Sequence, residues 1–309
     1  MLSAAFGDAL GAPVEFLSWK DIVQHYGPGG IRAFAPAYGR LGAITDDTQL
    51  AMATARGLLR GAYADHFDEV EATLMEYLRW HESQQRTENR RAPGTTCLSA
   101  LAQWERSRSM KAANTSKGCG GVMRVHPVGL YHAGKPEKAY SLASACAEIT
   151  HGHPTSSVSS GFLAALITLL VTDMPFQDAF FSCRNLAAQC SGSEETIEIL
   201  DRCLLESKNQ ADAATGITHL GEGWVAEEAL AIGIYSYLRH EAEPFEALVA
   251  SVNHSGDSDS TGAICGAIVG AIHGYDWIPK DMLETLEHRD DLINLADRLN
   301  NIAYLPKLG

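Results

Sequence analysis

Asp257-Ser258-Asp259-Ser260-Thr261 sets two carboxylates and three hydroxyls in five residues, directly before an apolar run that ends at Ile272. The run is predicted to form a helix, and glycine recurs along it and just beyond it at every fourth residue, at Gly262, Gly266, Gly270 and Gly274. Residues four apart share one face of a helix, and a glycine there costs about 1 kcal/mol relative to alanine. A face of glycines therefore predicts close packing against another backbone, with the acidic stretch at the N-terminal end of a buried helix.

The acidic stretch has two interpretations. Carboxylate and hydroxyl oxygens gathered on a rigid, buried support suit a Mg²⁺ or Mn²⁺ site, and the helix dipole favours negative charge at this end. Alternatively, an Asp or Ser caps the helix N-terminus and does nothing more. Taken alone, the stretch is compatible with both.

A second cluster of the same kind precedes another predicted helix. Thr45-Asp46-Asp47-Thr48 opens a helix expected over 48–60. Capping needs one carboxylate, whereas each cluster offers two, so the repetition indicates a shared site. Two such clusters facing one another could hold two divalent ions, an arrangement known in hydrolytic catalysis.

Composition narrows the class of protein. Of 309 residues, 46% are hydrophobic and 20% charged, which is typical of a globular protein with a sizeable core. The formal charge of -14 disfavours binding to nucleic acid or to an anionic membrane, and the longest apolar runs are too short to span a bilayer. The seven cysteines are scattered without a C-x-x-C pair, and the N-terminus lacks a basic signal-peptide start. We therefore expect a cytoplasmic protein without membrane or nucleic-acid partners.

The periodicity is helical along the whole chain. No stretch has the period of a strand, and Gly and Pro are spread evenly without a linker. The prediction is one all-α domain over residues 1–309. Its expected helices cover 1–19 (interrupted at Gly11-Ala12-Pro13), 48–60, 63–82, 95–106, 139–149, 156–172, 176–190, 194–207, 221–237, 244–253 and 261–272, with a polar helix or helix pair over 279–303.

Three further features carry weaker signals. Asp8 and Glu15 are the acids of an otherwise uncharged stretch, where a lone acid is usually solvated or capping. The glycine-rich loop 114–121 exposes backbone N–H groups that could cradle a phosphate, but it matches no nucleotide-binding motif and could be a plain turn. His151 and His153, two residues apart, could bind a metal or stack on a base; without a nearby cysteine or third histidine, zinc is disfavoured.

Taken in order, these pieces resemble the ADP-ribosylglycohydrolase family, typified by the glycohydrolase that reactivates dinitrogenase reductase. Six motifs carry the resemblance, over about residues 7–274: Gly7-Asp8-Ala9-Leu10-Gly11-Ala12-Pro13-Val14-Glu15-Phe16, Thr45-Asp46-Asp47-Thr48, Gly118-Cys119-Gly120-Gly121-Val122-Met123-Arg124, Thr150-His151-Gly152-His153-Pro154, Gly223-Trp224-Val225-Ala226-Glu227-Glu228-Ala229 and Gly256-Asp257-Ser258-Asp259-Ser260-Thr261-Gly262-Ala263. The chain starts only six residues before the first motif, so its opening helix is shorter than the resemblance predicts.

The resemblance implies a single compact, orthogonal helical bundle with two Mg²⁺ or Mn²⁺ ions. The implied metal ligands are Thr45, Asp46, Asp47, Asp257, Asp259 and Ser260, with serine at the last position where many members have threonine. Glu15 corresponds to an acidic residue assigned as acid/base or as a gated ligand, and it forms the expected catalytic set with Asp46 and Asp259. Gly118, Gly120 and Gly121 would contact the pyrophosphate, and His151 the adenosine side.

The implied activity is hydrolysis that removes ADP-ribose from modified protein side chains, with arginine the first candidate acceptor. The expected partner is an ADP-ribosylated protein or an ADP-ribose-containing small molecule, and without a long heptad run we expect a monomer. Three alternatives stay open: hydrolysis of a serine-linked or O-acyl ADP-ribose, an immunity protein that occludes an ADP-ribosylating toxin, and a two-metal phosphohydrolase, for which no motif is present.

Overall fold

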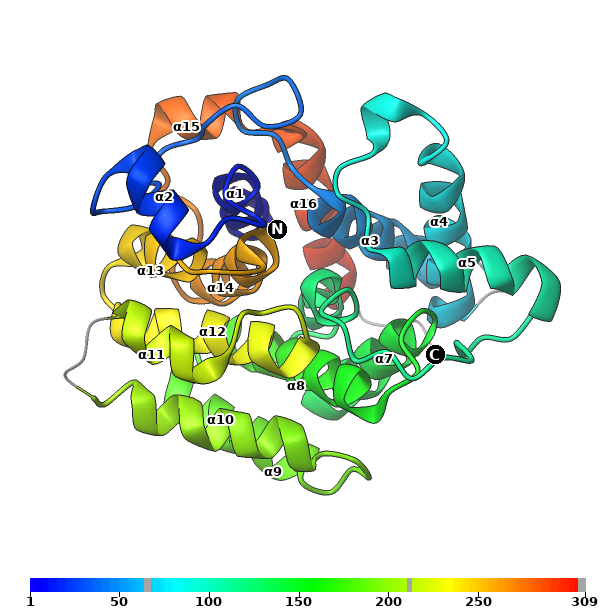
Figure 1. The fold of residues 1–309 in the computed structure, drawn as a ribbon. Coiled ribbons are helices and arrows are strands. Elements are labelled where there is room, and N and C mark those ends of the chain that lie inside the picture. Colours follow the sequence, from blue (N-terminus) through cyan, green and yellow to red (C-terminus); the bar gives the residue numbers. More distant parts are fainter. Residues whose placement is uncertain (64–67, 210–212, 305–309) are drawn as a thin grey trace.

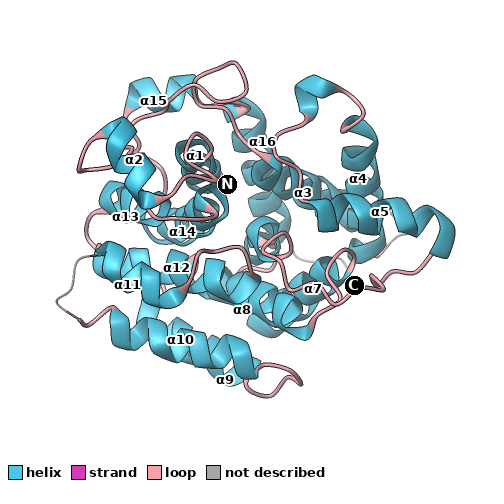
Figure 2. Cartoon of the chain, in the orientation of Figure 1, coloured by secondary structure: helices cyan, strands magenta, loops and turns pink. Residues whose placement is uncertain are grey.

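The computed structural model describes residues 1–63, 68–209 and 213–304 (Figure 1). Over these residues every regular element is a helix and no β-strand occurs, as Figure 2 shows, so the predicted all-α fold is confirmed. The helices are α1 (Leu2–Gly11), α2 (Trp19–Tyr26), α3 (Asp46–Tyr63), α4 (Glu69–Ser83), α5 (Thr95–Ser107), α6 (His126–Tyr131), α7 (Pro136–Glu148), α8 (Pro154–Leu170), α9 (Phe176–Ala187), α10 (Glu194–Glu206), α11 (Ala213–Leu220), α12 (Ala226–Arg239), α13 (Pro244–Val252), α14 (Ser258–His273), α15 (Lys280–Thr285) and α16 (Arg289–Tyr304), with 3₁₀ turns at Thr87–Asn89 and Val122–Arg124.

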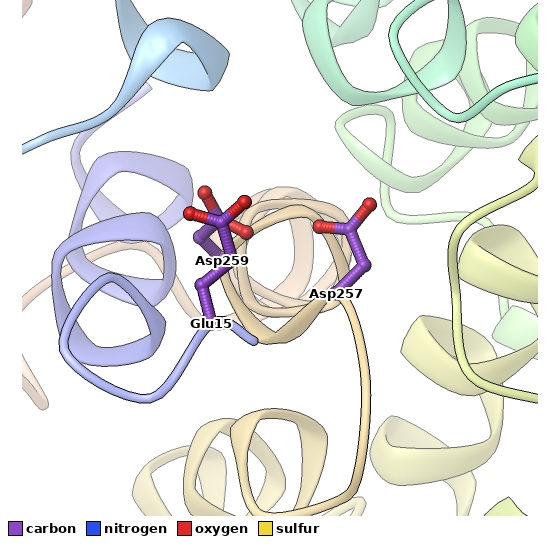
Figure 3. A group of neighbouring side chains, drawn as sticks. All are labelled: Glu15, Asp257 and Asp259. Carbon is purple, nitrogen blue, oxygen red and sulfur yellow. The ribbon is translucent and has the colours of Figure 1, made fainter. Parts of the chain in front are cut away.

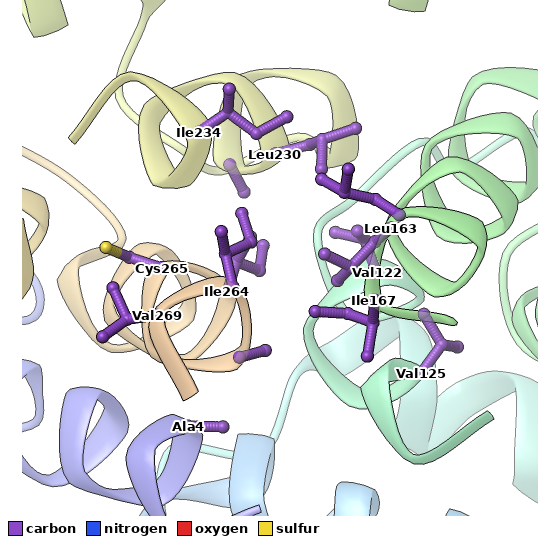
Figure 4. Packing of buried hydrophobic residues seen from close by; sticks show 14 of the residues in the cluster. Ala4, Val122, Val125, Leu163, Ile167, Leu230, Ile234, Ile264, Cys265 and Val269 are labelled. Atoms are coloured by element: carbon purple, nitrogen blue, oxygen red, sulfur yellow. The ribbon is translucent and has the colours of Figure 1, made fainter. Parts of the chain in front are cut away.

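Helix α14 lies in the interior, with α1, α12 and α13 around it (Figure 1). Every residue of α14 from Ser258 to Val269 is buried. On one side Ile264 packs between Leu230 of α12 and Ile167 of α8 (Figure 4). A helix that is apolar all round belongs in a core, and α14 is the helix around which the others are packed.

The glycine face of α14 lies directly against the backbone of α1. A Cβ atom added at Gly262 would overlap the carbonyl oxygen of Gly7, and one added at Gly266 would overlap that of Ser3. The contact is mutual, because a Cβ at Gly7 would overlap the carbonyl oxygen of Gly262. The close packing predicted from the glycine spacing is therefore confirmed, and it brings the first turns of α14 beside the end of α1.

Gly266→Ala is expected to lower the free energy of unfolding by about 1–3 kcal/mol, although alanine is the better helix former. The new Cβ can be accommodated only if the backbones of α1 and α14 separate. Gly270→Ala is the matched control, since its Cβ would meet the Ser3 side chain at 2.9 Å rather than a carbonyl, and its loss should be smaller. Urea unfolding midpoints test this. Equal stability of the wild type and Gly266→Ala would contradict the packing argument.

Two predicted boundaries are wrong: the end of the opening helix, and the start of the helix expected over 221–237, which begins only at Ala226. The opening helix ends at Gly11, not at residue 19, because the chain turns after it: Phe16 has a φ of 70°, and a separate helix α2 begins after Ser18, whose hydroxyl accepts from the N–H of Asp21. The short helices α2, α6 and α11 were not predicted, since six to eight residues give too few turns for a periodic signal. The polar segment 279–303 is a helix pair, α15 and α16.

Candidate active site

A cavity of about 340 Å³ opens where α3 and α14 begin. Five carboxylates line it, contributed by the start of α3, the start of α14 and the loop after α1. Its other lining residues come from the loop before α5 and the start of that helix, from the glycine-rich loop and the 3₁₀ turn after it, from His151 and Ser260, and from two aromatic side chains. The lining comprises Glu15, Phe16, Asp46, Asp47, Ala92, Pro93, Gly94, Thr95, Thr96, Cys97, Gly118, Cys119, Gly120, Met123, His151, Trp224, Asp257, Asp259 and Ser260. The structure thus brings the two acidic clusters, 211 residues apart in the sequence from Asp46 to Asp257, into one cavity.

The tightest acidic group consists of Glu15, Asp257 and Asp259 (Figure 3). One oxygen from each carboxylate lies within 4.8 Å of the others. Asp257 stands at the N-cap position of α14, yet its side chain makes no capping hydrogen bond. The interpretation of Asp257 as a simple helix cap is therefore wrong, and its carboxylate is turned toward the cavity instead.

The N-terminus of helix α3 is capped by a residue of another helix, α1. The carboxylate of Asp8, on α1, accepts hydrogen bonds from Thr45 N at 3.0 and 3.1 Å, from Thr48 N at 3.1 Å and from Thr48 Oγ1 at 2.5 Å. Asp8 is fully buried, so it is a cap and not a solvated acid. Because Asp8 satisfies these donors, Asp46 and Asp47 are not needed for that task and face the cavity.

The cavity contains buried acceptors without donors. Glu15 Oε2 and Asp47 Oδ1 have no hydrogen-bond partner among the described residues. Burial, together with the charge of Asp259, raises the pKa values of Glu15, Asp46 and Asp47 well above their usual range. The pKa of Asp257 is raised by the same two causes. Uncompensated buried charge costs several kcal/mol, so this set of hard oxygen donors fits a divalent cation such as Mg²⁺ or Mn²⁺.

The lining includes no Lys or Arg side chain among the described residues, so the positive charge missing from the site is not supplied by the chain. Thr45 is the predicted ligand that does not line the cavity: it is fully buried, and its Oγ1 lies 3.4 Å from Asp47 Oδ2. Ser260 does line it. The acidic centre therefore consists of carboxylates from three segments, with Ser260 as the predicted hydroxyl ligand that also lines the cavity.

The glycine-rich loop forms another wall. Gly118 and Gly120 line the cavity, and a Cβ at Gly120 would lie 2.9 Å from both Cys97 Sγ and the His151 ring. Gly121 does not line the cavity and packs toward Ser156. The loop therefore presents backbone, not side chains, to the space beside the carboxylates.

His151 lies under this loop with its ring at the cavity. Its Nδ1 is 2.8 Å from Thr150 Oγ1, and the side chain is buried. Burial and the nearby Arg124 charge lower the pKa of His151 to about 3. The imidazole is therefore neutral at physiological pH and can accept or donate a single hydrogen bond.

The aromatic pair at the cavity rim was not predicted. Phe16 and Trp224 stack with ring centroids 5.5 Å apart and an interplanar angle of 20°. Phe16 is 67% exposed, which is unusual for a large apolar side chain. Trp224 directly follows Gly223, which has a φ of 83°. This Gly-Trp pair was the sequence signal that could have indicated an exposed aromatic side chain at the rim. Met123 and Cys119 were likewise not singled out as lining residues.

The metal-free protein is expected to lose stability as the pH rises, and divalent cations are expected to restore it. Burial and the Asp259 charge raise the pKa of Asp8 to about 7, so between its unfolded pKa and that value the folded state holds a proton that the unfolded chain has lost. Stability then falls with rising pH. The other carboxylates with raised pKa values extend this loss of stability to higher pH.

The lowered pKa of His151 has the opposite effect, because it makes stability rise with pH, but only below the unfolded pKa of 6.5. Thermal unfolding at about pH 7 and about pH 9, in EDTA and in Mn²⁺, therefore avoids the contribution of His151. The buried amino group of Met1, whose pKa burial lowers to about 6, opposes the loss of stability, and buried cysteines such as Cys146 and Cys265, whose pKa values burial raises, add to it. The carboxylate contribution is the part that Mn²⁺ reverses. We expect a lower Tm at the higher pH in EDTA, and a larger gain from Mn²⁺ there. A Tm insensitive to both pH and cations would contradict the buried acidic centre.

None of the described helices is both long enough and apolar enough to cross a membrane. The family model described as ADP-ribosylglycohydrolase matches residues 1–308. The ADP-ribosyl-[dinitrogen reductase] glycohydrolase of Rhodospirillum rubrum is 28% identical, covering 93% of this chain and 88% of that protein. The ADP-ribosylarginine hydrolase Tri1 of Serratia proteamaculans is 24% identical, covering 98% and 78%. A solved structure described as an ADP-ribosylglycohydrolase-related protein complex superimposes with a TM-score of 0.71 at 26% identity, covering 98% of this chain and 95% of that one.

Proposed function

Because this chain belongs to the ADP-ribosylglycohydrolase family and is an ADP-ribosyl hydrolase, we propose that it removes ADP-ribose from arginine side chains of modified proteins. The reaction is proposed to need two divalent cations, Mg²⁺ or Mn²⁺, in the acidic cavity. The observation that carries this proposal is the set of five carboxylates on one cavity, two of them with buried oxygens that lack any donor among the described residues.

The residues proposed to hold the cations are Thr45, Asp46 and Asp47 at the start of α3, and Asp257, Asp259 and Ser260 at the start of α14. When bound, such cations polarise hydroxyls of the substrate and make a water a better nucleophile at neutral pH. The chain's own contribution is to keep these oxygens fixed: Asp8 fixes the start of α3, and the glycine contact with α1 fixes α14.

Glu15 is the proposed acid/base. The bond to be broken joins the anomeric carbon of ribose to the guanidino nitrogen, and such bonds break through an oxocarbenium-like state with carboxylic-acid help. Burial and the surrounding carboxylates favour the protonated form of Glu15, and its Oε2 has no partner among the described residues. Glu15 can therefore protonate the leaving nitrogen and then accept a proton from the attacking water.

The glycine-rich loop is the proposed pyrophosphate site. Ser116 Oγ accepts from Gly118 N at 3.3 Å, and the Trp224 carbonyl accepts from Cys119 N at 3.2 Å. Gly120 is the cavity-lining glycine whose N–H meets no acceptor among the described residues. That N–H is available to a phosphate oxygen, and we propose that the neutral His151 beneath it contacts the adenosine side.

Arginine is favoured as the acceptor by the charge of the cavity. A guanidinium is a delocalised cation that pairs with carboxylates and stacks on aromatic faces, and this cavity offers carboxylates with Phe16 and Trp224 at its rim. A serine hydroxyl gains nothing from such surroundings. The name of the Serratia relative specifies the arginine linkage for that protein.

The experiment that tests the acceptor compares arginine-linked, serine-linked and O-acyl ADP-ribose as substrates at equal concentration with Mg²⁺ or Mn²⁺. We expect free ADP-ribose to appear fastest from the arginine linkage. Faster release from either of the other two would move the assignment to that linkage while leaving the hydrolase in place.

The remaining proposals concern the whole molecule. The seven cysteines form no disulfide, which fits a reducing cytoplasm, and we propose that the protein acts there as a monomer of one domain. Occlusion of a toxin, as an immunity protein, stays an alternative that no described surface feature specifically favours.

A further inference from the structure

A thiol sits inside the candidate metal centre. The Sγ atom of Cys119 lies 2.7 Å from Asp257 Oδ2 and 3.7 Å from the hydroxyl of Ser260. Cys119 lines the cavity and is only partly buried. Its sulfur therefore faces the same space as the carboxylates that are proposed to hold Mg²⁺ or Mn²⁺.

Cys119 differs from the other six cysteines, all of which lie in the described part of the chain. Cys97 also lines the cavity, but its sulfur is contacted by a guanidinium nitrogen of Arg124 at 3.5 Å. The sulfurs of Cys190, Cys203 and Cys265 approach backbone carbonyls. Among the hydrogen bonds of the described residues, only Cys119 joins a thiol to a carboxylate.

A second observation points to a cation in this space. Asp47 is 3% exposed and lines the cavity, and its Oδ1 has no hydrogen-bond donor among the described residues. A buried anionic oxygen without a donor requires compensation by a positive charge. The thiol thus lies in the same cavity as a carboxylate oxygen that favours a bound cation.

Sulfur changes which cations this centre prefers. Mg²⁺ and Mn²⁺ favour carboxylate and hydroxyl oxygens, whereas thiolates bind zinc and other soft or borderline ions. Binding converts Cys119–SH and a free divalent ion into a thiolate–metal bond plus a proton released to solvent, with no change in oxidation state. Asp257, in contact with the sulfur, supplies a second ligand to the same ion.

We infer that Cys119 and Asp257 bind a thiophilic divalent cation, Zn²⁺ or Cd²⁺, at this centre, and that such an ion displaces the cations used for hydrolysis. The inference rests on the proposed metal centre. It makes zinc an inhibitor of this protein and Cys119 the residue responsible.

Titration of the chelator-stripped protein with Cd²⁺ tests the inference, because a thiolate–cadmium bond gives an ultraviolet charge-transfer band whether or not the protein is catalytically active. For the wild type and for Cys97→Ser, the control from the same cavity, we expect the band to reach its maximum at one Cd²⁺ per chain. Cys119→Ser should lose the band and bind Cd²⁺ at least about tenfold more weakly. A retained band in Cys119→Ser, or its loss in Cys97→Ser, would overturn the assignment.

Two companion measurements complete the test. Asp257→Asn keeps the thiol and should weaken Cd²⁺ binding, and saturating Mn²⁺ should raise the Cd²⁺ concentration needed to form the band in the wild type. A site unaffected by Mn²⁺ would lie outside the centre and would contradict the inference. If ADP-ribose release fails but the band behaves as expected, the proposed reaction falls and the cation site stands. Circular dichroism of Cys119→Ser establishes that a lost band is not lost folding.

Discussion

Asp259→Ala is expected to reduce metal-dependent release of ADP-ribose at least about 10³-fold, which corresponds to roughly 4 kcal/mol of barrier. An oxygen of Asp259 lies within 4.8 Å of oxygens of both Glu15 and Asp257, so this carboxylate belongs to the tightest acidic group in the cavity. Its loss removes a proposed ligand from the group in which Glu15 meets the start of α14. The measurement is the initial rate at saturating Mn²⁺.

The same substitution should leave the metal-free protein folded and more stable. The charge of Asp259 is a cause of the raised pKa values of Asp8, Glu15 and Asp46, after burial in each case. Removing it relieves repulsion among buried carboxylates, so the Tm in EDTA should rise while activity is lost. This opposite response of stability and activity is typical of a residue retained for function.

Asp178→Ala is the matched control, since Asp178 is an exposed acid in the first turn of α9, remote from the cavity lining. It should change neither the rate nor the response to Mn²⁺. Full activity of Asp259→Ala would refute the centre. Protection of a toxin's target by Asp259→Ala, as strong as by the wild type, would instead support occlusion.

Glu15→Gln is expected to slow hydrolysis by about 10²- to 10⁴-fold, the usual contribution of a general acid or base. Glutamine keeps the size and hydrogen-bonding shape of the side chain but cannot hold and release the proton. Because a general acid works in its protonated form, the wild-type rate should fall as the pH rises through the pKa of Glu15 in the loaded enzyme. That limb of the pH profile should be absent in Glu15→Gln.

The alternative role of Glu15, a gated metal ligand, gives a different result. A ligand variant would bind Mn²⁺ more weakly and would recover its rate at high Mn²⁺, whereas an acid/base variant would stay slow at saturation. Glu15→Asp separates the two further, because it retains a titratable group with a shorter reach. Recovery of Glu15→Gln to the wild-type rate at high Mn²⁺ would reject the acid/base assignment.

The features that were predictable from the sequence have local signals. The four-residue spacing of Gly262, Gly266 and Gly270 predicted a backbone contact, and the partner proved to be α1. The two acidic clusters were recognisable because each offers more carboxylates than capping requires. Long amphipathic helices such as α10 were close to their predicted bounds for the same reason: the pattern repeats over several turns.

The features that were missed depend on residues distant in the sequence. Nothing near Asp8 indicates that it caps a helix 37 residues later at Thr45, and the contact of Cys119 with Asp257 spans 138 residues. Phe16 has a positive φ in the turn that follows α1 and lines the cavity, but it is neither a glycine nor an asparagine, so the sequence gives no signal of this turn. Such contacts arise when segments distant in the sequence pack together, and they are not encoded at any one position.

The most direct test of the account is release of free ADP-ribose from an arginine-ADP-ribosylated substrate, measured with Mg²⁺, with Mn²⁺, with EDTA, and with Mn²⁺ restored after EDTA. We expect release with either cation, none in EDTA, and recovery when Mn²⁺ is added back. Release that continues undiminished in EDTA, or no release from a folded sample with any cation, would contradict the metal-dependent centre at the starts of α3 and α14.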